Sequence, residues 1–137
     1  MNEVFCENEL KIKLSPAEYD LIRSYADKQP TSQVNHYFDT TDDLSRMVRV
    51  RVKNGKYALQ YKNRNSVKGN VFNCAEQGIE VDKEFLQNAI DGCLDKDFVN
   101  KYFGSDFAKN LRYLGCAETQ RIKFDFFGFE IELDKNI

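Results

Sequence analysis

The amino-acid sequence predicts a single α+β domain in which an antiparallel β-sheet curls into a barrel or tunnel with a charged lumen, with helices packed outside. Three observations lead to this fold class. The 137 residues include 11 Phe and 7 Tyr, which suit the half-buried surfaces of strands. Several segments alternate between apolar and charged residues, which is the period of a strand. Other segments carry apolar residues at helical spacing, so they can cover the apolar face of a sheet.

The N-terminal part of the chain predicts a strand followed by a capped helix. Apolar and charged residues alternate over residues 4–14. Ser15 and Glu18 have the spacing of a capping box, and Pro16 suits the first helical position. We therefore expect a helix that begins at Pro16 and ends near Pro30.

The middle of the chain predicts a hairpin between flanking strands. Asn54-Gly55 is the signal of a two-residue type I′ turn. The expected elements are, in order, strands at 33–39, 47–53 and 57–62, a polar, basic loop at 63–70 and a less regular strand at 71–81.

The C-terminal part predicts two helical segments and a last hairpin. Asp82 is placed to cap the first of these helices, and Gly92 to end it. The expected elements are a helix at 83–91, a helical stretch at 96–114 broken at Gly104 and restarted by Ser105, and strands at 117–126 and 129–134 joined at Phe127-Gly128.

The charged faces of the predicted strands are sorted by sign. Every second residue of a strand lies on one face, so Arg49, Arg51 and Lys53 share a basic face. Glu132 and Asp134 lie in the same way on an acidic face of the last strand. An ordinary sheet with one solvated side would show the same alternation, so that alternative stays open.

If the charged faces point inward, they need counter-charges. Like charges gathered in a lumen repel each other strongly unless partners neutralise them. A divalent metal ion held by carboxylates and a polyphosphate held by Arg and Lys meet both demands. Oxygen ligands without Cys or His favour Mg²⁺ or Mn²⁺.

Composition excludes several classes of function. A net charge of −2 does not suit a protein that coats DNA. His36 is the only histidine and no C-x-x-C pair occurs, so neither a zinc site nor a His-based nucleophile is expected. No apolar stretch approaches the ~20 residues of a membrane span, and Glu3 and Glu7 argue against a signal peptide. Neither DNA nor a membrane is an expected partner, and the free thiols favour the cytoplasm.

An ordered set of motifs resembles the CYTH superfamily, the triphosphate tunnel metalloenzymes. The set begins with an E-x-E-x-K motif and continues to the end of the chain; its members are Glu7-Asn8-Glu9-Leu10-Lys11, NHYFDT at 35–40, Arg49-Val50-Arg51, NGKYALQYK at 54–62, Thr119-Gln120-Arg121 and Leu133-Asp134. The residues of the second and fourth motifs are most similar to those of the small bacterial branch of this superfamily.

The resemblance implies an antiparallel tunnel that binds triphosphates and uses Mg²⁺ or Mn²⁺. It implies metal ligands at Glu7, Glu9, Glu132 and Asp134. It implies substrate binding at Lys11, Arg49, Arg51, Lys62, Arg121 and Lys123, of which Lys11, Arg49, Arg51 and Arg121 would also be catalytic. The family's mid-chain acidic residue matches either Glu76 or Glu80.

The resemblance also implies a range of activities. Inorganic triphosphatase is the first expectation; class IV adenylyl cyclase activity and non-catalytic binding of polyphosphate or nucleotides are the alternatives. Members usually continue past the Leu-Asp motif with a further carboxylate-bearing strand, whereas this sequence stops at Ile137. We therefore expect a tunnel that is incomplete on its C-terminal side, and a homodimer that covers the open edge.

Overall fold

The computed structural model describes residues 3–40, 46–68, 71–104 and 108–137. These residues form seven strands and three helices. The strands are β1 (Glu3–Leu10), β2 (Thr31–Asp39), β3 (Arg46–Lys53), β4 (Lys56–Lys68), β5 (Val71–Val81), β6 (Arg112–Phe126) and β7 (Phe129–Asn136); the helices are α1 (Pro16–Arg23), α2 (Lys83–Ile90) and α3 (Lys96–Phe103).

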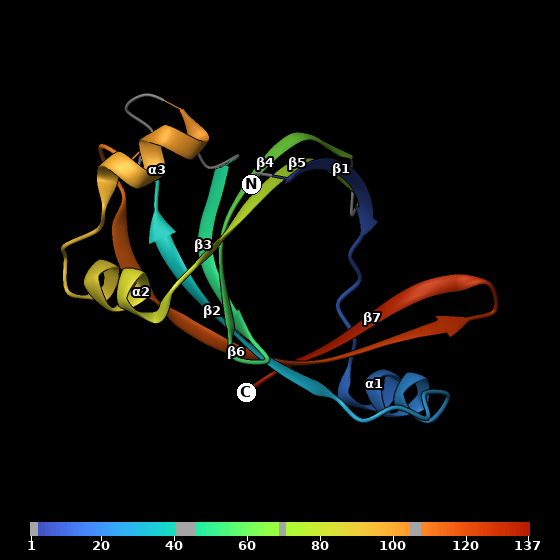
Figure 1. Ribbon diagram of the computed structural model, residues 1–137. Helices are drawn as coiled ribbons and strands as arrows, with labels where there is room; N and C mark the ends of the chain where they lie inside the picture. The colour runs from blue at the N-terminus through green and yellow to red at the C-terminus, as the bar shows by residue number, and fades with distance from the viewer. Residues whose placement is uncertain (1–2, 41–45, 69–70, 105–107) are drawn as a thin grey trace.

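All seven strands belong to one antiparallel sheet in the order β1-β5-β4-β3-β2-β6-β7. The sheet curls into an arc, and the three helices lie on its outer side (Figure 1). Its two edge strands, β1 and β7, do not pair with each other among the described residues. The predicted α+β fold is thus confirmed, with the sheet left open between these two edges. The inner side of the arc is called the lumen below.

Two apolar clusters hold the helices against the outer side of the sheet. The larger one joins Val48, Val50 and Leu59 of the central strands to Leu86 of α2 and Val99 of α3. The smaller one joins buried residues of β6 and β7 to the apolar residues of α1; its members are Ile122, Phe124 and Leu133, packed by Leu14, Tyr19 and Ile22. Because the charged residues alternate with these core positions, the same packing directs them into the lumen.

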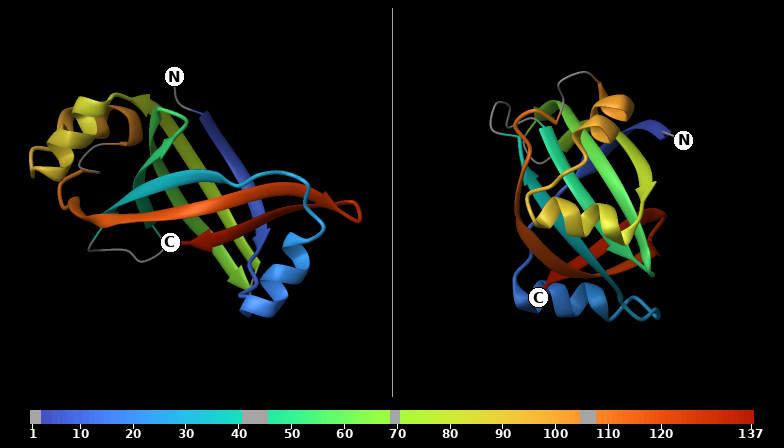
Figure 2. Two further views of the ribbon diagram at one scale, coloured as in Figure 1. Left: turned by 90° about the horizontal axis from the view of Figure 1, so that it is seen from below. Right: turned by 60° about the vertical axis from the view of Figure 1, so that its left-hand side comes forward.

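Helix α1 connects the two open edges of the sheet. The chain leaves β1 at one edge, and α1 then packs against β6 and β7 at the other edge, as both views of Figure 2 show. The partly buried apolar residues of α1 therefore link the end of β1 to the opposite edge of the sheet. None of the described helices combines the length and the apolar character that a membrane span requires.

The local signals in the sequence are confirmed at the caps and turns. The Ser15 hydroxyl accepts from the Glu18 backbone N–H at 3.1 Å, and the Glu18 carboxylate accepts from the Ser15 backbone N–H at 2.9 Å. Asp82 caps α2 through the Phe85 N–H. Asn54 and Gly55 both have positive φ, at 53° and 73°, as a type I′ turn requires.

Some predicted boundaries are wrong. The first strand ends at Leu10 rather than at residue 14, and α1 ends at Arg23 rather than near Pro30. Residues 63–68, predicted as a loop, continue β4, because β5 pairs with them as far as Lys68 opposite Val71. Residues 112–114, predicted as helix, begin β6, because pairing with β2 supplies their backbone hydrogen bonds. The predicted restart at Ser105 lies outside the described residues.

Candidate anion-binding lumen

The charged face of the central strands is buried. Arg49, Lys62 and Glu76 each expose only 8% of their surface, while Val48 and Val50, on the opposite face, belong to the core. A solvated face would leave such long side chains in water. The alternative of a sheet with one wet side is therefore wrong for β3, β4 and β5, and these charges lie in a lumen with little solvent.

Arg49 and Arg51 are each held by an amide from a neighbouring strand. Arg49 lies opposite Gln60 in β4, and its Nε donates to Gln60 Oε1 at 2.7 Å. Arg51 lies opposite Asn35 in β2, and its Nε donates to Asn35 Oδ1 at 3.0 Å. Among the described residues, neither arginine forms an ion pair with a carboxylate. The amides therefore orient both guanidinium groups without neutralising them.

The lumen is electrostatically positive around Arg51. Burial, together with repulsion from Arg49 and Arg121, lowers the pKa of Arg51 to about 10, and Glu76 opposes this shift only in part. Arg51 stays protonated at neutral pH, but the folded chain holds that charge at a cost. An anion bound beside it would remove the cost.

Arg121 is held differently from the two arginines of β3. Its Nη1 lies 2.6 Å from Glu132 Oε2, and its Nε and Nη2 donate to the two Asp134 oxygens at 2.8 and 2.9 Å. Two strands of one hairpin therefore supply both the cation and its counter-charges. Arg121 must leave at least one carboxylate before it can donate fully to a bound phosphate.

The remaining predicted substrate-binding residues differ in exposure. Lys62 is buried opposite Glu76, with Nζ 3.8 Å from Glu76 Oε2. Lys123 is exposed and lies within 4.0 Å of Glu130 and Glu132. Lys11 is exposed and follows the end of β1. The structure thus gathers Arg49, Arg51, Lys62 and Arg121 into the lumen and leaves Lys11 and Lys123 at its periphery.

The predicted metal ligands lie on the two edge strands. In β1, Glu7 pairs with Cys74 and Glu9 with Phe72. Glu132 and Asp134 lie on β7, at the other edge, and both contact Arg121. The curl of the sheet brings both edges to the same side of the arc (Figure 1). Among the described residues, no three His, Cys, Asp or Glu side chains lie together in a way that could hold a metal ion.

The acidic residue that the sequence left open is resolved by burial. Glu76 is buried and contacts Lys62, whereas Glu80 is exposed opposite Ala58. Of the two, Glu76 is the carboxylate that is buried beside Lys62. One of its partners is thus a cation of the protein, Lys62.

Sequence reasoning missed the two amides that hold the arginines. Asn35 and Gln60 lie within the motifs at 35–40 and 54–62, but nothing local to them indicates a role. The available signal was the hairpin register: counting back from the Asn54-Gly55 turn places Gln60 opposite Arg49. The Asn35 contact depends on the pairing of β2 with β3, which the sequence does not specify locally.

The chain is similar to a known domain family and to solved structures. Residues 6–136 match the family model of the CYTH domain. A crystal structure of a candidate adenylate cyclase from Bacillus halodurans is similar with a TM-score of 0.68 and 17% identity, over 96% of this chain and 72% of that chain. A candidate adenylyl cyclase from Hippeastrum, described as having a dominant triphosphatase activity, is similar with a TM-score of 0.66 and 20% identity, over 100% of this chain and 73% of that one. The search of curated proteins found no match.

Proposed function

The chain belongs to the CYTH domain family, and on this premise we propose that it binds a triphosphate compound in its lumen and hydrolyses it with a divalent metal ion. Inorganic triphosphate is the first candidate substrate. The observation that carries the proposal is the pair Arg49 and Arg51 on one face of β3. Arg49 is buried and Arg51 is half-buried, and both are held by amides and have no carboxylate partner among the described residues. The CYTH match and the similarity to the two solved structures support it.

The two arginines supply the binding energy for the phosphate chain. Successive residues on one face of a strand lie roughly 7 Å apart, so the two guanidinium groups reach different phosphoryl groups of one ligand. Both amides contact Nε, which leaves Nη2 of each arginine to donate to phosphate oxygens. Charge-assisted hydrogen bonds of this kind are the strong ones, and burial strengthens them further.

The carboxylates of β7 fit a cation in their chemistry. Glu132 and Asp134 already stabilise the positive charge of Arg121, and oxygen-only ligands suit Mg²⁺ or Mn²⁺. Together with Glu7 and Glu9, they are the residues that we propose to hold the metal. A bound metal would neutralise phosphate charge and orient the attacking water. Arg121 would turn from Asp134 toward the phosphate, adding charge stabilisation as the terminal bond breaks.

Two alternatives use the same binding site. The two similar structures are both described as candidate adenylate cyclases, so cyclisation of ATP is the competing reaction. Here the ribose hydroxyl, rather than water, would attack the phosphate nearest the ribose. A non-catalytic chain that only binds polyphosphate or nucleotides is the other alternative.

One incubation distinguishes these functions. The chain is mixed with tripolyphosphate or ATP, with Mg²⁺ or Mn²⁺, and phosphate, pyrophosphate and cyclic AMP are measured. Phosphate release from tripolyphosphate supports the proposal, and cyclic AMP supports the cyclase. Binding in calorimetry without turnover supports the non-catalytic alternative. Absence of any binding contradicts the proposed function.

The variant Arg49→Ala tests whether the turnover arises in the lumen. Arg112→Ala is its matched control, because Arg112 is an arginine that is exposed and paired with Asp39. Loss of activity in the first variant and not in the second supports the site. Equal activity of both variants contradicts it.

A further inference from the structure

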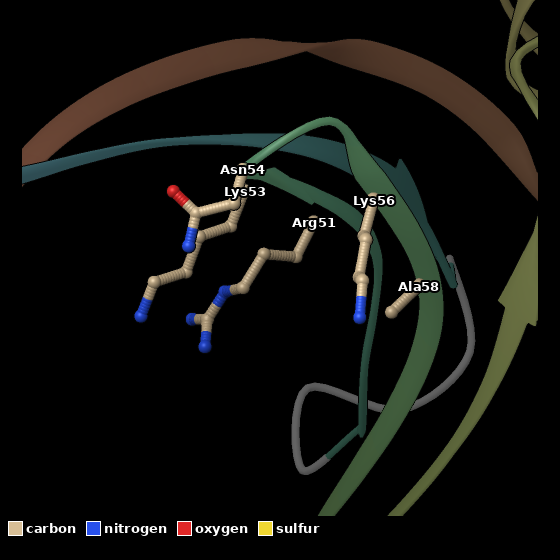
Figure 3. A pocket seen from close by; sticks show the side chains of 5 residues that line it. All are labelled: Arg51, Lys53, Asn54, Lys56 and Ala58. Carbon is tan, nitrogen blue, oxygen red and sulfur yellow. The ribbon is translucent and has the colours of Figure 1, made fainter.

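An open cavity of about 380 Å³ lies at the turn of the β3–β4 hairpin. Arg51, Lys53, Asn54, Lys56 and Ala58 line it. Figure 3 shows that the guanidinium of Arg51 and the amino groups of Lys53 and Lys56 extend from the hairpin to the same side. The cavity therefore continues the basic face of β3 beyond the two arginines.

The cavity carries more positive charge than the fold requires. Lys53 and Lys56 are directly opposite each other across the hairpin, where like charges destabilise the pairing. Neither lysine has an ion pair among the described residues. The turn itself depends on the positive φ of Asn54 and Gly55 and needs no lysine on either side.

The β3–β4 hairpin that forms the cavity contains no acidic residue, and the nearest carboxylates in the register are Glu76, which pairs with Lys62, and Glu80, which lies opposite Ala58, both on β5. Residues 44–75 contain no Asp or Glu and eight basic residues; these are Arg46, Arg49, Arg51, Lys53, Lys56, Lys62, Arg64 and Lys68. Elsewhere in the sheet, Arg112, Arg121 and Lys123 each contact a carboxylate. Among the described residues no carboxylate forms an ion pair with Lys53 or Lys56, so a bound anion would supply the negative charge at this end of the hairpin.

We propose that this cavity is a second anion subsite, which binds a fourth phosphoryl group of a linear polyphosphate. Arg49, Arg51 and Lys53 occupy alternate positions of β3, so their side chains span roughly 14 Å along the strand. A triphosphate centred on the two arginines does not use the far end of this row. A chain of four or more phosphoryl groups reaches Lys53 and Lys56. The inference rests on the proposed function, because it extends the same bound chain.

Calorimetry with the full chain tests the subsite, using tripolyphosphate and tetrapolyphosphate as probes. The test variant carries Lys53→Gln and Lys56→Gln. The control variant carries Lys28→Gln and Lys83→Gln, which remove the same charge from two exposed positions outside the cavity. We expect the wild type and the control to bind tetrapolyphosphate about tenfold more tightly than tripolyphosphate. The test variant should lose this preference while its tripolyphosphate affinity changes less than threefold.

Other outcomes separate the two proposals. Equal affinity of the wild type for the two probes overturns the subsite and leaves the proposed function standing. An equal loss of affinity for both probes in the test variant also overturns it, because the lysines then act as general attraction for anions. A wild type that binds neither probe overturns both proposals. Thermal unfolding verifies that each variant is folded before it is titrated.

Discussion

Two hairpins of the same sheet hold their arginines with different partners, a neutral amide in one and carboxylates in the other. In the β3–β4 hairpin, Arg49 is oriented by a neutral amide and keeps its charge available. In the β6–β7 hairpin, Arg121 is oriented by two carboxylates that neutralise it. The two cases differ in whether the group that orients the arginine also neutralises its charge. An amide fixes a guanidinium for a ligand, whereas a carboxylate makes it part of the protein's own ion-pair network.

The contrast also explains why one sheet can hold both kinds of charge. Arg49 and Arg51 have no carboxylate partner among the described residues, and burial together with repulsion from Arg49 and Arg121 lowers the pKa of Arg51. The β7 side carries the carboxylates Glu132 and Asp134. A triphosphate with a divalent cation has the complementary arrangement, an anionic chain beside a positive ion. We therefore propose that the phosphate chain lies along the β3–β4 hairpin and the metal on the β7 side of the lumen.

The largest expected effect is the loss of an amide-held arginine. Arg49→Ala should weaken tripolyphosphate binding at least tenfold, which corresponds to about 1.4 kcal/mol. Arg51→Lys should weaken it as well, because a point charge cannot replace a planar fork of donors. Calorimetry without metal measures both. Unchanged affinity in Arg49→Ala would remove the basis for placing the ligand in the lumen.

The next effect comes from changing an amide into a carboxylate. Gln60→Glu and Asn35→Asp keep the contact to Nε but add a negative charge, so Arg49 and Arg51 would each face a carboxylate, as Arg121 does. We expect tripolyphosphate affinity to fall about three- to tenfold and the folded structure to persist. The control is Gln87→Glu, which makes the same change at an exposed position on α2. A similar decrease in that control would mean that net charge, and not the arginine partner, determines binding.

The reverse change replaces a carboxylate partner of Arg121 with an amide. Asp134→Asn leaves an amide in place of one carboxylate and so partly frees the charge of Arg121. Metal-free tripolyphosphate binding should strengthen about threefold, while metal-dependent hydrolysis should fall because a proposed ligand is lost. Parallel losses of binding and hydrolysis would contradict the assignment of Asp134 to the metal side.

Glu9→Gln tests the other edge of the sheet. If Glu9 is a metal ligand, as the family resemblance implies, this variant should lose metal-dependent hydrolysis and should bind Mn²⁺ more weakly in calorimetry. Tripolyphosphate binding without metal should be retained. Equal Mn²⁺ affinity in the wild type and the variant would exclude Glu9 from the metal site.

The smallest expected effect concerns stability. Burial and repulsion lower the pKa of Arg51 to about 10, below its unfolded value, so folding at neutral pH retains an unfavourable charge. This cost is present below pH 10 and is relieved as the pH rises above it, because the unfolded chain then binds more protons. Arg51→Gln should therefore raise the melting temperature by a few degrees, measured without phosphate.

Arg121→Gln is the matched comparison for stability. It removes the counter-charge of Glu132 and Asp134, so the melting temperature should fall. If both variants lower the melting temperature equally, the distinction between unneutralised and paired arginines has no energetic basis.

Much of the fold could be predicted from sequence because its signals are local. The capping box at Ser15, the Asp82 cap and the Asn54-Gly55 turn each depend on a few adjacent residues. The predicted boundaries are wrong where pairing between strands overrides the local preference for a loop or a helix. Residues 63–68 have the sequence of a polar loop, yet they continue β4 because they pair with β5. Residues 112–114 continue a helical pattern in sequence, yet they pair with β2.

The sequence predicts which charged residues share a face of a strand, but it does not predict which residues of neighbouring strands contact them. Alternation placed Arg49 and Arg51 on one face, because period two is visible in a single strand. Their difference from Arg121 depends on register between strands, since Asn35 and Arg51 are joined only through the β2–β3 pairing. The burial of Lys62 and Glu76 likewise follows from the curl of the sheet, which no single segment encodes.

The central claim, that Arg49 and Arg51 bind the phosphate chain, is tested most directly by an NMR titration with tripolyphosphate in the absence of metal. The arginine side-chain Nε–H signals are assigned with single Arg→Lys variants. The account predicts that the signals of Arg49 and Arg51 shift together and saturate at one equivalent, while that of exposed Arg112 stays in place. Stationary Arg49 and Arg51 signals at saturating ligand would contradict it.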